Sequence, residues 1–297
     1  MIKMKSNLTP YFLLLPALVV LFVIVIYPFL YSLYTSFHYW YLASPKPPVF
    51  VGLKNYIDIL TSNEMRFSFF ITVRFFIISI AMQMSIGLGL GFFLNNKYLL
   101  WPKFFRSLFI IPMMIAPAVV ATVWRMMYHP SYGVLTYLAS IFGINDIGWV
   151  QKPGIALYSI SLVEIWQWSP FIALITLAGL QTLPISILEA ARVDGATTSQ
   201  IFWNVKLPLM RPFIALAFIM RFIFSFRVFE SFRIITKGGP GTATDVLMHK
   251  LYLKGFQYMM IGEASALAFL ILAVITILAM ASFTWLFPSL KPGGELK

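Results

Sequence analysis

An acidic residue lies deep in a segment that otherwise avoids charge. Glu164 falls well inside the apolar run 155–180, and Trp168 and Phe171 follow it at i+4 and i+7, on one face of a helix. A carboxylate accepts hydrogen bonds from hydroxyl groups, and an indole offers a flat apolar surface to the C–H face of a ring. This face therefore has the chemistry to contact a polyhydroxylated molecule. The alternative is an internal ion pair, with Trp168 turned toward lipid or a neighbouring helix.

A second set of charges lies in the apolar run 212–235. On a straight helix Arg227, Glu230 and Arg233 share one face and Arg221 points nearly opposite, so the two groups are not expected to line one pathway. The i, i+3 spacing of Arg227 and Glu230 predicts an ion pair. Arg221 is expected to pair with Glu164 or with a partner subunit, because a buried charge needs a countercharge.

Between these two runs stands a polar stretch with the pattern of a bent helical hairpin. It reads Glu189-Ala190-Ala191-Arg192-Val193-Asp194-Gly195 and is followed by Leu207-Pro208. Pro184 suits the first position of a helix, and Gly195 suits a C-terminal cap that needs positive φ.

The second half of this hairpin has its own start and stop signals. Thr197 and Gln200 have the spacing of a capping box ahead of Ile201, and Pro208 and Pro212 are expected to stop the helix. A hairpin of this kind, held outside a bilayer, is suited to touching another molecule.

The elements that must position these residues are membrane helices. Of the 297 residues 60% are hydrophobic and 11% charged, which excludes an ordinary soluble domain. The sequence predicts an all-α polytopic protein with six transmembrane helices. The apolar runs long enough to span are 11–34, 67–94, 107–127, 155–180, 212–235 and 264–287. Kinks are expected at Pro16, Pro28, Pro112 and Pro117.

The distribution of Lys and Arg predicts that both termini are cytoplasmic. In that orientation ten basic residues lie in the shorter inner segments: Lys3, Lys5, Lys97, Lys103, Arg106, Arg192, Lys206, Arg211, Lys291 and Lys297. Seven lie in the longer outer segments: Lys46, Lys54, Arg66, Lys152, Lys237, Lys250 and Lys254. This orientation places the hairpin 184–208 in the cytoplasm.

Several other kinds of chemistry find no support in the sequence. The net charge of +12 is expected to face anionic lipid rather than nucleic acid, since no basic-aromatic patch is present. The chain has no cysteine, and its three histidines are far apart, so no metal site and no catalytic residue is predicted. Gly87 and Gly91 lie inside an apolar helix, where their spacing favours close helix packing rather than a phosphate loop.

Three separated motifs resemble those of the permease subunits of ABC importers. Glu189, Ala190, Ala191, Gly195, Leu207 and Pro208 fit the EAA signature of that family. The flanking sequences Trp166-Gln167-Trp168-Ser169-Pro170 and Lys237-Gly238-Gly239-Pro240-Gly241-Thr242-Ala243-Thr244 are similar to its carbohydrate branch, in particular to the first permease subunit of the maltose and glycerol-phosphate type.

The resemblance implies a type I importer fold and a division of labour between chains. It implies an N-terminal helix and external loop over 1–66, a core over 67–288 with the coupling hairpin at 184–208, and a cytoplasmic tail over 289–297. Glu189, Ala190, Ala191, Asp194, Gly195, Leu207 and Pro208 would contact an ATPase. Glu164, Trp168, Phe171 and Arg221 are the candidates for the substrate pathway.

The implied partners supply everything that this chain lacks. They are a second permease subunit, two cytoplasmic ATPase subunits that bind ATP, and an external solute-binding protein that meets the Gly238–Thr244 segment. The chain itself would be no enzyme and would need no cofactor. Two alternatives stay open: a permease for glycerol phosphate or another polar solute, favoured by Arg221 and Arg227, and an ion-coupled secondary transporter.

Overall fold

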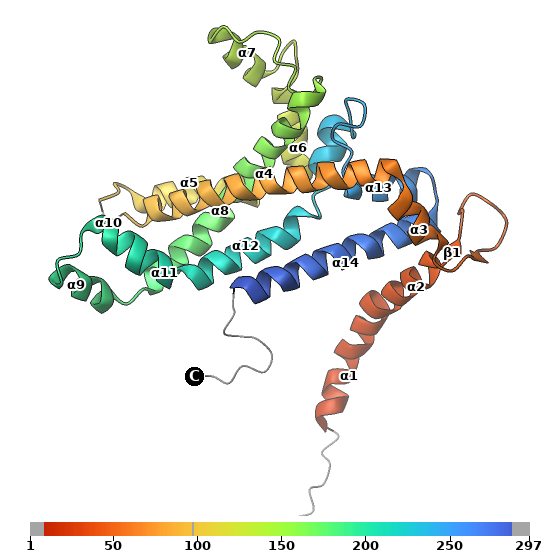
Figure 1. Cartoon of the computed structure of the whole chain (residues 1–297), viewed down its shortest axis with the longest axis horizontal. Helices are drawn as coiled ribbons and strands as arrows, with labels where there is room; N and C mark the ends of the chain where they lie inside the picture. The colour runs from red at the N-terminus through yellow and green to blue at the C-terminus, as the bar shows by residue number, and fades with distance from the viewer. Residues whose placement is uncertain (1–8, 97, 287–297) are drawn as a thin grey trace, which may run out of the picture. The chain divides into compact units, whose positions relative to one another are not determined.

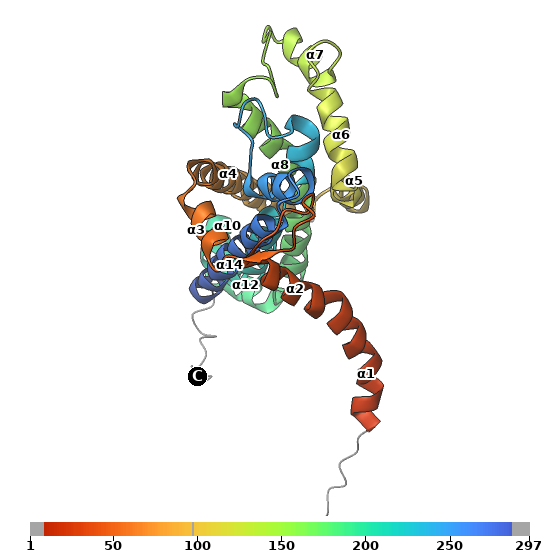
Figure 2. The same ribbon diagram turned by 90° about the vertical axis from the view of Figure 1, so that its right-hand side faces the viewer.

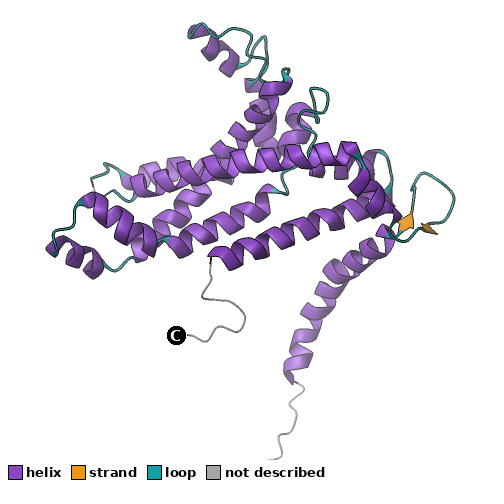
Figure 3. Ribbon diagram, viewed as in Figure 1, coloured by secondary structure: helices purple, strands orange, loops and turns teal. Residues whose placement is uncertain are grey.

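The computed structural model describes residues 9–96 and 98–286, so the expected tail 289–297 lies outside the described residues. The chain divides into two compact units. One contains the residues up to Met65 and Leu251–Leu272, and the other contains Arg66–Lys250 and the residues from Ala273 onward. Helices are the main elements of both units, as Figure 3 shows.

The first unit begins with a long apolar helix that its own chain leaves uncovered. It comprises α1 (Thr9–Leu21), a π-helical turn η1 (Phe22–Ile26) and α2 (Tyr27–Ser36). None of the most apolar stretch of Leu13–Ser36 is buried inside the chain. A helix so apolar and so exposed requires lipid or another apolar surface around it. Pro28 follows this π turn closely. The wider i→i+5 hydrogen bonding of the turn comes directly before a proline, which has no backbone N–H to donate.

A small polar network follows the C-terminal end of α2 in this unit. The strands β1 (His38–Tyr39) and β2 (Val49–Phe50) pair antiparallel, and α3 (Lys54–Thr61) follows. The buried amide of Asn55 donates to the carbonyl oxygens of Ser36 and His38, at 2.9 and 3.0 Å. These two bonds tie α3 to the end of α2, because they satisfy carbonyls that the helix end leaves open.

The second unit is built around one helix. Its elements are α4 (Asn63–Leu94, whose first residues belong to the other unit), α5 (Pro102–Met114), α6 (Pro117–Met127), α7 (Val134–Ile141), α8 (Pro153–Thr182), α9 (Ile185–Val193), α10 (Thr198–Ile201), η2 (Phe202–Lys206), α11 (Leu207–Leu209), α12 (Arg211–Ser225), η3 (Phe232–Thr236) and α13 (Leu247–Tyr252). The turn η4 (Leu253–Gln257) belongs to the first unit, and α14 (Ile261–Leu286) begins in the first unit and ends in the second. Within α8 67% of the most apolar stretch is buried, against 33% for α4. A helix that is apolar on all sides is stable when other helices surround it, and α8 holds that place.

The six predicted spans are confirmed, with two of them bent. Single helices long and apolar enough to cross a membrane are Leu13–Ser36, Asn63–Leu94, Pro153–Thr182 and Ile261–Thr284. The pair α5 and α6 bends by 93° between Met114 and Pro117, where the sequence predicted a kink. Figure 2 shows this bend, with α7 beyond the far end of α6.

The fifth predicted span is not the straight helix that its sequence suggested. A bend of 59° separates Thr198–Leu209 from α12, and α12 then ends at Ser225. Helical structure resumes at Glu230 and runs on through η3. No Gly or Pro lies between Pro212 and Gly238 to mark this break, and its cause is tertiary: Phe232 packs in the core against Phe75, with ring centroids 4.8 Å apart.

The two glycines predicted to permit close packing do so. A β-carbon at Gly87 would lie 2.5 Å from Cβ of Ile172 and 2.8 Å from the carbonyl oxygen of Ser169. One at Gly91 would lie 2.5 Å from Cβ of Thr176. Because all three neighbours belong to α8, these glycines let the backbones of α4 and α8 meet.

We expect Gly87→Ala to destabilise the chain by about 1–3 kcal/mol, because the added methyl group overlaps side-chain and backbone atoms of α8. Gly89→Ala is the matched control, since a β-carbon there meets nothing within 4 Å. The measurement is the melting temperature of the detergent-solubilised protein. Equal melting temperatures for the two variants would contradict this account of the packing.

Candidate functional site

The hairpin between α8 and α12 folds by the local signals that predicted it. Gly195 has φ of +78° directly after α9, and the amide of Ala196 donates to the carbonyl of Ala191 at 3.0 Å. The capping box is also present: the amide of Gln200 donates to Oγ1 of Thr197 at 3.3 Å, and the amide of Thr197 donates to Oε1 of Gln200 at 2.8 Å. These local bonds cap the two helices at the turn.

The expectation that Pro208 stops the second helix is wrong. The helix passes Pro208 and ends at Leu209, and the break lies at Met210, ahead of Pro212. The reason is the π turn η2, in which the amide of Leu207 donates to the carbonyl of Phe202. The i→i+5 hydrogen bonding of this turn lets the helix continue through Pro208, which has no backbone N–H to donate.

The hairpin presents its motif residues to the surroundings. Glu189, Ala190, Asp194 and Gly195 are exposed, whereas Ala191, Leu207 and Pro208 are half-buried. Large apolar side chains are exposed beside them, and Val193 reaches 87%. Figure 1 shows α9, α10 and α11 together at the ends of α8 and α12. An exposed apolar surface of this kind indicates a contact with another molecule.

A cavity of about 380 Å³ lies where α6, α8 and α12 meet, and all four residues predicted for the pathway line it. Its walls comprise Met113, Pro117, Glu164, Trp168, Phe171, Met220, Arg221, Phe224, Arg227, Val228 and Glu230. Trp168 and Phe171 are half-buried and Glu164 is buried. The structure thus brings the sequence-predicted face of α8 to the wall of a cavity.

The expected pairing of Arg221 with Glu164 is present. Nη2 of Arg221 lies 3.7 Å from Oε2 of Glu164, and the two side chains are only 1% and 3% exposed. The guanidinium also lies over the ring of Trp168, 4.7 Å from its centroid. An internal ion pair and a Trp168 that faces a cavity therefore occur together, although the sequence suggested them as alternatives.

Two side chains that sequence reasoning missed complete this buried network. Gln83 of α4 accepts from Nε of Arg221 at 2.9 Å and donates to the carbonyl of Glu164 at 3.1 Å. Ser231 donates to Oε1 of Glu164 at 3.0 Å. A lone amide in an apolar run was the available signal for Gln83, because a polar group in hydrocarbon needs a partner.

The prediction that Arg221 cannot share a pathway with the other charges of its segment is wrong. Arg227 and Glu230 line the same cavity as Arg221, because the chain breaks after Ser225 and no straight helix fixes their directions. In the described part of the chain no ion pair joins Arg227 to Glu230, so that prediction is wrong too. Arg233 lies in η3 and is absent from the cavity wall.

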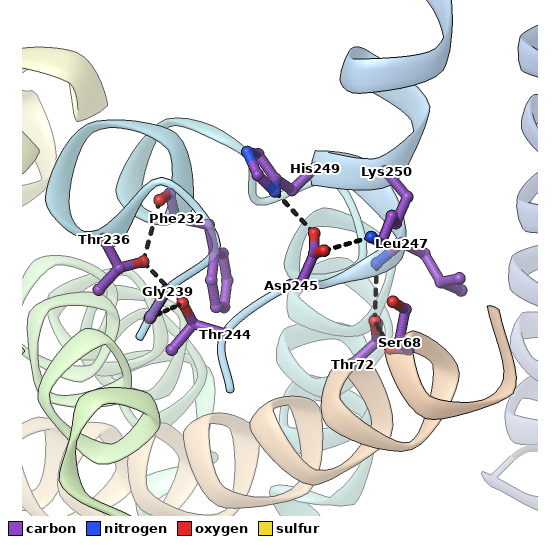
Figure 4. Close-up of polar contacts among 10 residues, drawn as sticks. All are labelled: Ser68, Thr72, Phe232, Thr236, Gly239, Thr244, Asp245, Leu247, His249 and Lys250. Carbon is purple, nitrogen blue, oxygen red and sulfur yellow. Dashed lines mark hydrogen bonds and ion pairs between the residues drawn. The ribbon is translucent and has the colours of Figure 1, made fainter. Parts of the chain in front are cut away.

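The Gly-Gly-Pro segment forms the predicted turn, and side chains beneath it hold it in place, as Figure 4 shows. Thr244 donates to the carbonyl of Gly239 at 2.6 Å and shares a hydrogen bond with Thr236 at 2.7 Å. Asp245 pairs with His249 at 2.7 Å and with Lys250. His249 is therefore a buried structural residue, and among the described residues no group of His, Asp and Glu is placed to hold a metal ion.

Comparison with known proteins identifies the family to which this fold belongs. Residues 83–292 match the family described as binding-protein-dependent transport system inner membrane component. The chain belongs to this family. It is therefore a multi-pass inner-membrane permease subunit that depends on a solute-binding protein, as the motifs predicted.

Individual relatives agree with that assignment over nearly the whole length. The permease is 33% identical to the trehalose/maltose transport system permease protein MalF of Thermococcus litoralis, over 95% of this chain and 93% of that protein. It is 30% identical to the sn-glycerol-3-phosphate transport system permease protein UgpA of Brucella suis, over 96% of each.

The fold agrees as well. A bacterial alginate ABC transporter, solved in complex with an alginate pentasaccharide-bound periplasmic protein, matches with a TM-score of 0.82 and 21% identity, over 99% of this chain and 98% of that one. The fold is that of an ABC importer permease.

We expect Arg221→Met to destabilise the permease by about 3–5 kcal/mol, because it leaves the buried carboxylate of Glu164 without its countercharge. Changing Glu164→Met in addition is expected to restore most of the lost stability. Arg227→Met, which removes an exposed guanidinium from the same cavity, serves as the control. Thermal unfolding in detergent measures all three, and a double variant no more stable than Arg221→Met would contradict the pairing.

Proposed function

We propose that this chain forms half of the translocation pathway of an ATP-driven importer of neutral carbohydrates. The observation that carries the proposal is the cavity, which joins a half-buried indole to hydrogen-bonding charged groups. Its walls contain two carboxylates, Glu164 and Glu230, and two guanidiniums, Arg221 and Arg227. Because these charges balance, the cavity favours an uncharged solute with many hydroxyl groups over an anion.

In this proposal the permease catalyses no reaction, and conformational changes of other subunits drive its own. A second permease subunit completes the pathway, and two ATPase subunits bind ATP in the cytoplasm. Both termini and the hairpin 184–208 face that side, in line with the excess of Lys and Arg in the inner segments. The sequence supports this division, because Gly238-Gly239-Pro240-Gly241 lacks the Lys-Ser/Thr of a nucleotide-binding loop.

Coupling is assigned to Glu189, Ala190, Ala191, Asp194, Gly195, Leu207 and Pro208. The small side chains of Ala190 and Gly195 allow another backbone to approach closely, and Glu189 offers a carboxylate to a basic partner. Closure of the ATPase pair moves the hairpin and opens the cavity to the outside, where the binding protein delivers the sugar. Hydrolysis of ATP then resets the helices.

The relatives' names support carbohydrate as the substrate class, and one of them supplies the second candidate. A glycerol-phosphate permease is among them, and the exposed guanidinium of Arg227 is suited to a phosphate. A thermal-shift screen of the cognate binding protein separates the two. We expect stabilisation by neutral saccharides, whereas stabilisation by glycerol 3-phosphate alone would replace the proposal by its alternative.

We expect Ala190→Trp to abolish recruitment of the ATPase subunits while the permease itself still folds, because the bulky ring fills the proposed contact. Ala178→Trp is the matched control, since Ala178 is also an exposed helical alanine but lies on α8. Co-purification and ATP hydrolysis are the measurements. Normal recruitment by Ala190→Trp would remove the hairpin from its proposed role.

We expect Glu164→Gln to lower sugar uptake into proteoliposomes about tenfold or more, because it removes a charged acceptor in the cavity wall. Arg74→Gln, on α4 and outside the cavity wall, is expected to leave uptake near that of the wild type. Unchanged uptake and unchanged substrate-stimulated ATP hydrolysis in Glu164→Gln would take this carboxylate out of the pathway.

A further inference from the structure

The buried ion pair of the cavity is open rather than closed. Nη2 of Arg221 and Oε2 of Glu164 are 3.7 Å apart, beyond the range of about 2.7–2.9 Å for a charge-assisted hydrogen bond. Neither atom has a hydrogen-bond partner among the described residues, although both are buried. Buried charges normally close such a gap, because an unsatisfied donor or acceptor is costly away from water.

Other contacts hold each charge in place through a different atom. Gln83 accepts from Nε of Arg221 at 2.9 Å, and its amide is fixed in turn by the carbonyl of Glu164 at 3.1 Å. Ser231 donates to Oε1 of Glu164 at 3.0 Å. The ring of Trp168 lies 4.7 Å from the guanidinium and supports its flat face. Each of the two charged groups is thus held through an atom other than the one nearest its partner.

The donor Nη2 of Arg221 and the acceptor Oε2 of Glu164 therefore lie side by side without a hydrogen bond between them. A hydroxyl group is the one common substrate group that donates to Oε2 and accepts from Nη2 at once. A phosphate or carboxylate oxygen would accept from Arg221 but meet repulsion from Glu164, and an ammonium group would meet the reverse.

We propose that Gln83 and Ser231 hold Glu164 and Arg221 apart, so that the open pair binds one hydroxyl group of a neutral carbohydrate in transit. Gln83 and Ser231 are positioning residues in this scheme, and the pair makes the contact. The inference rests on the proposed function, since it gives the carbohydrate its first hydrogen-bonding subsite. It also explains why two buried polar atoms of the cavity-lining residues stay unsatisfied.

Singly deoxygenated sugars test the subsite. The complete transporter is reconstituted with its binding protein, and uptake of maltose and trehalose is compared with that of their monodeoxy analogues. In the wild type one analogue is expected to show about tenfold lower kcat/KM than its parent, because one hydrogen-bonded hydroxyl is missing. In Ser231→Ala and Gln83→Met, where the pair closes, this ratio is expected to fall to near one while kcat/KM for the parent sugar drops.

Two controls separate positioning from folding. Ser225→Ala removes a buried hydroxyl that has no hydrogen-bond partner, and Ser79→Ala does the same on the helix that carries Gln83. Both are expected to keep the wild-type ratio. A tenfold ratio that persists in Ser231→Ala and Gln83→Met would overturn the inference while sugar uptake itself leaves the proposed function standing.

A structure determined without any solute tests the inference if neither sugar is transported. Electron cryomicroscopy of the assembled wild-type transporter, at a resolution that shows water, is expected to place a water between Oε2 and Nη2, in the position of the hydroxyl. In Ser231→Ala the two side chains are expected to make direct contact. Direct contact in the wild type would overturn the inference, and it would do so whatever the transported solute proves to be.

Discussion

A charge buried among membrane helices must find its countercharge there, and this requirement organises the larger unit of the permease. Glu164 is held by α8, Arg221 by α12 and Gln83 by α4, so one buried network joins three helices. Apolar packing alone gives membrane helices little directional preference, since lipid is as apolar as their side chains. The polar network and the glycine contacts between α4 and α8 supply the preference that apolar packing lacks.

The hydroxyl subsite that we propose uses the same network. A fully satisfied ion pair would stabilise the bundle and offer nothing to a solute. Here the pair is spread by contacts to other atoms of the same groups, and its two free atoms belong to residues that line a cavity beside Trp168. In the proposed subsite, stability and recognition come from different atoms of one pair of side chains.

The hairpin follows a contrasting design. Its turn is fixed by local bonds, the Gly195 cap and the Thr197–Gln200 capping box, while its motif residues and apolar side chains are exposed. A rigid element with an exposed surface transmits a push from a neighbouring protein without deforming. The cavity depends on contacts between distant residues, whereas the turn of the hairpin follows signals that are local in the sequence.

The sequence by itself determined whatever depends on neighbours along the chain. Helical periodicity placed Glu164, Trp168 and Phe171 on one face, capping signals placed the turn of the hairpin, and the cost of a buried charge matched Arg221 with Glu164. The residues of three separated motifs also indicated the family. These properties follow from short-range geometry and from the hydrophobic length of a span.

Tertiary structure alone decided where the chain departs from its local preference. Nothing near Ser225 marks the end of α12, and the break arises because Phe232 packs against Phe75 and Ser231 reaches Glu164. That break brings Arg227 and Glu230 into the cavity of Arg221, contrary to the expectation for a straight helix. The role of Gln83 was equally hidden, because a hydrogen bond between residues more than a hundred positions apart leaves no periodic trace in a sequence.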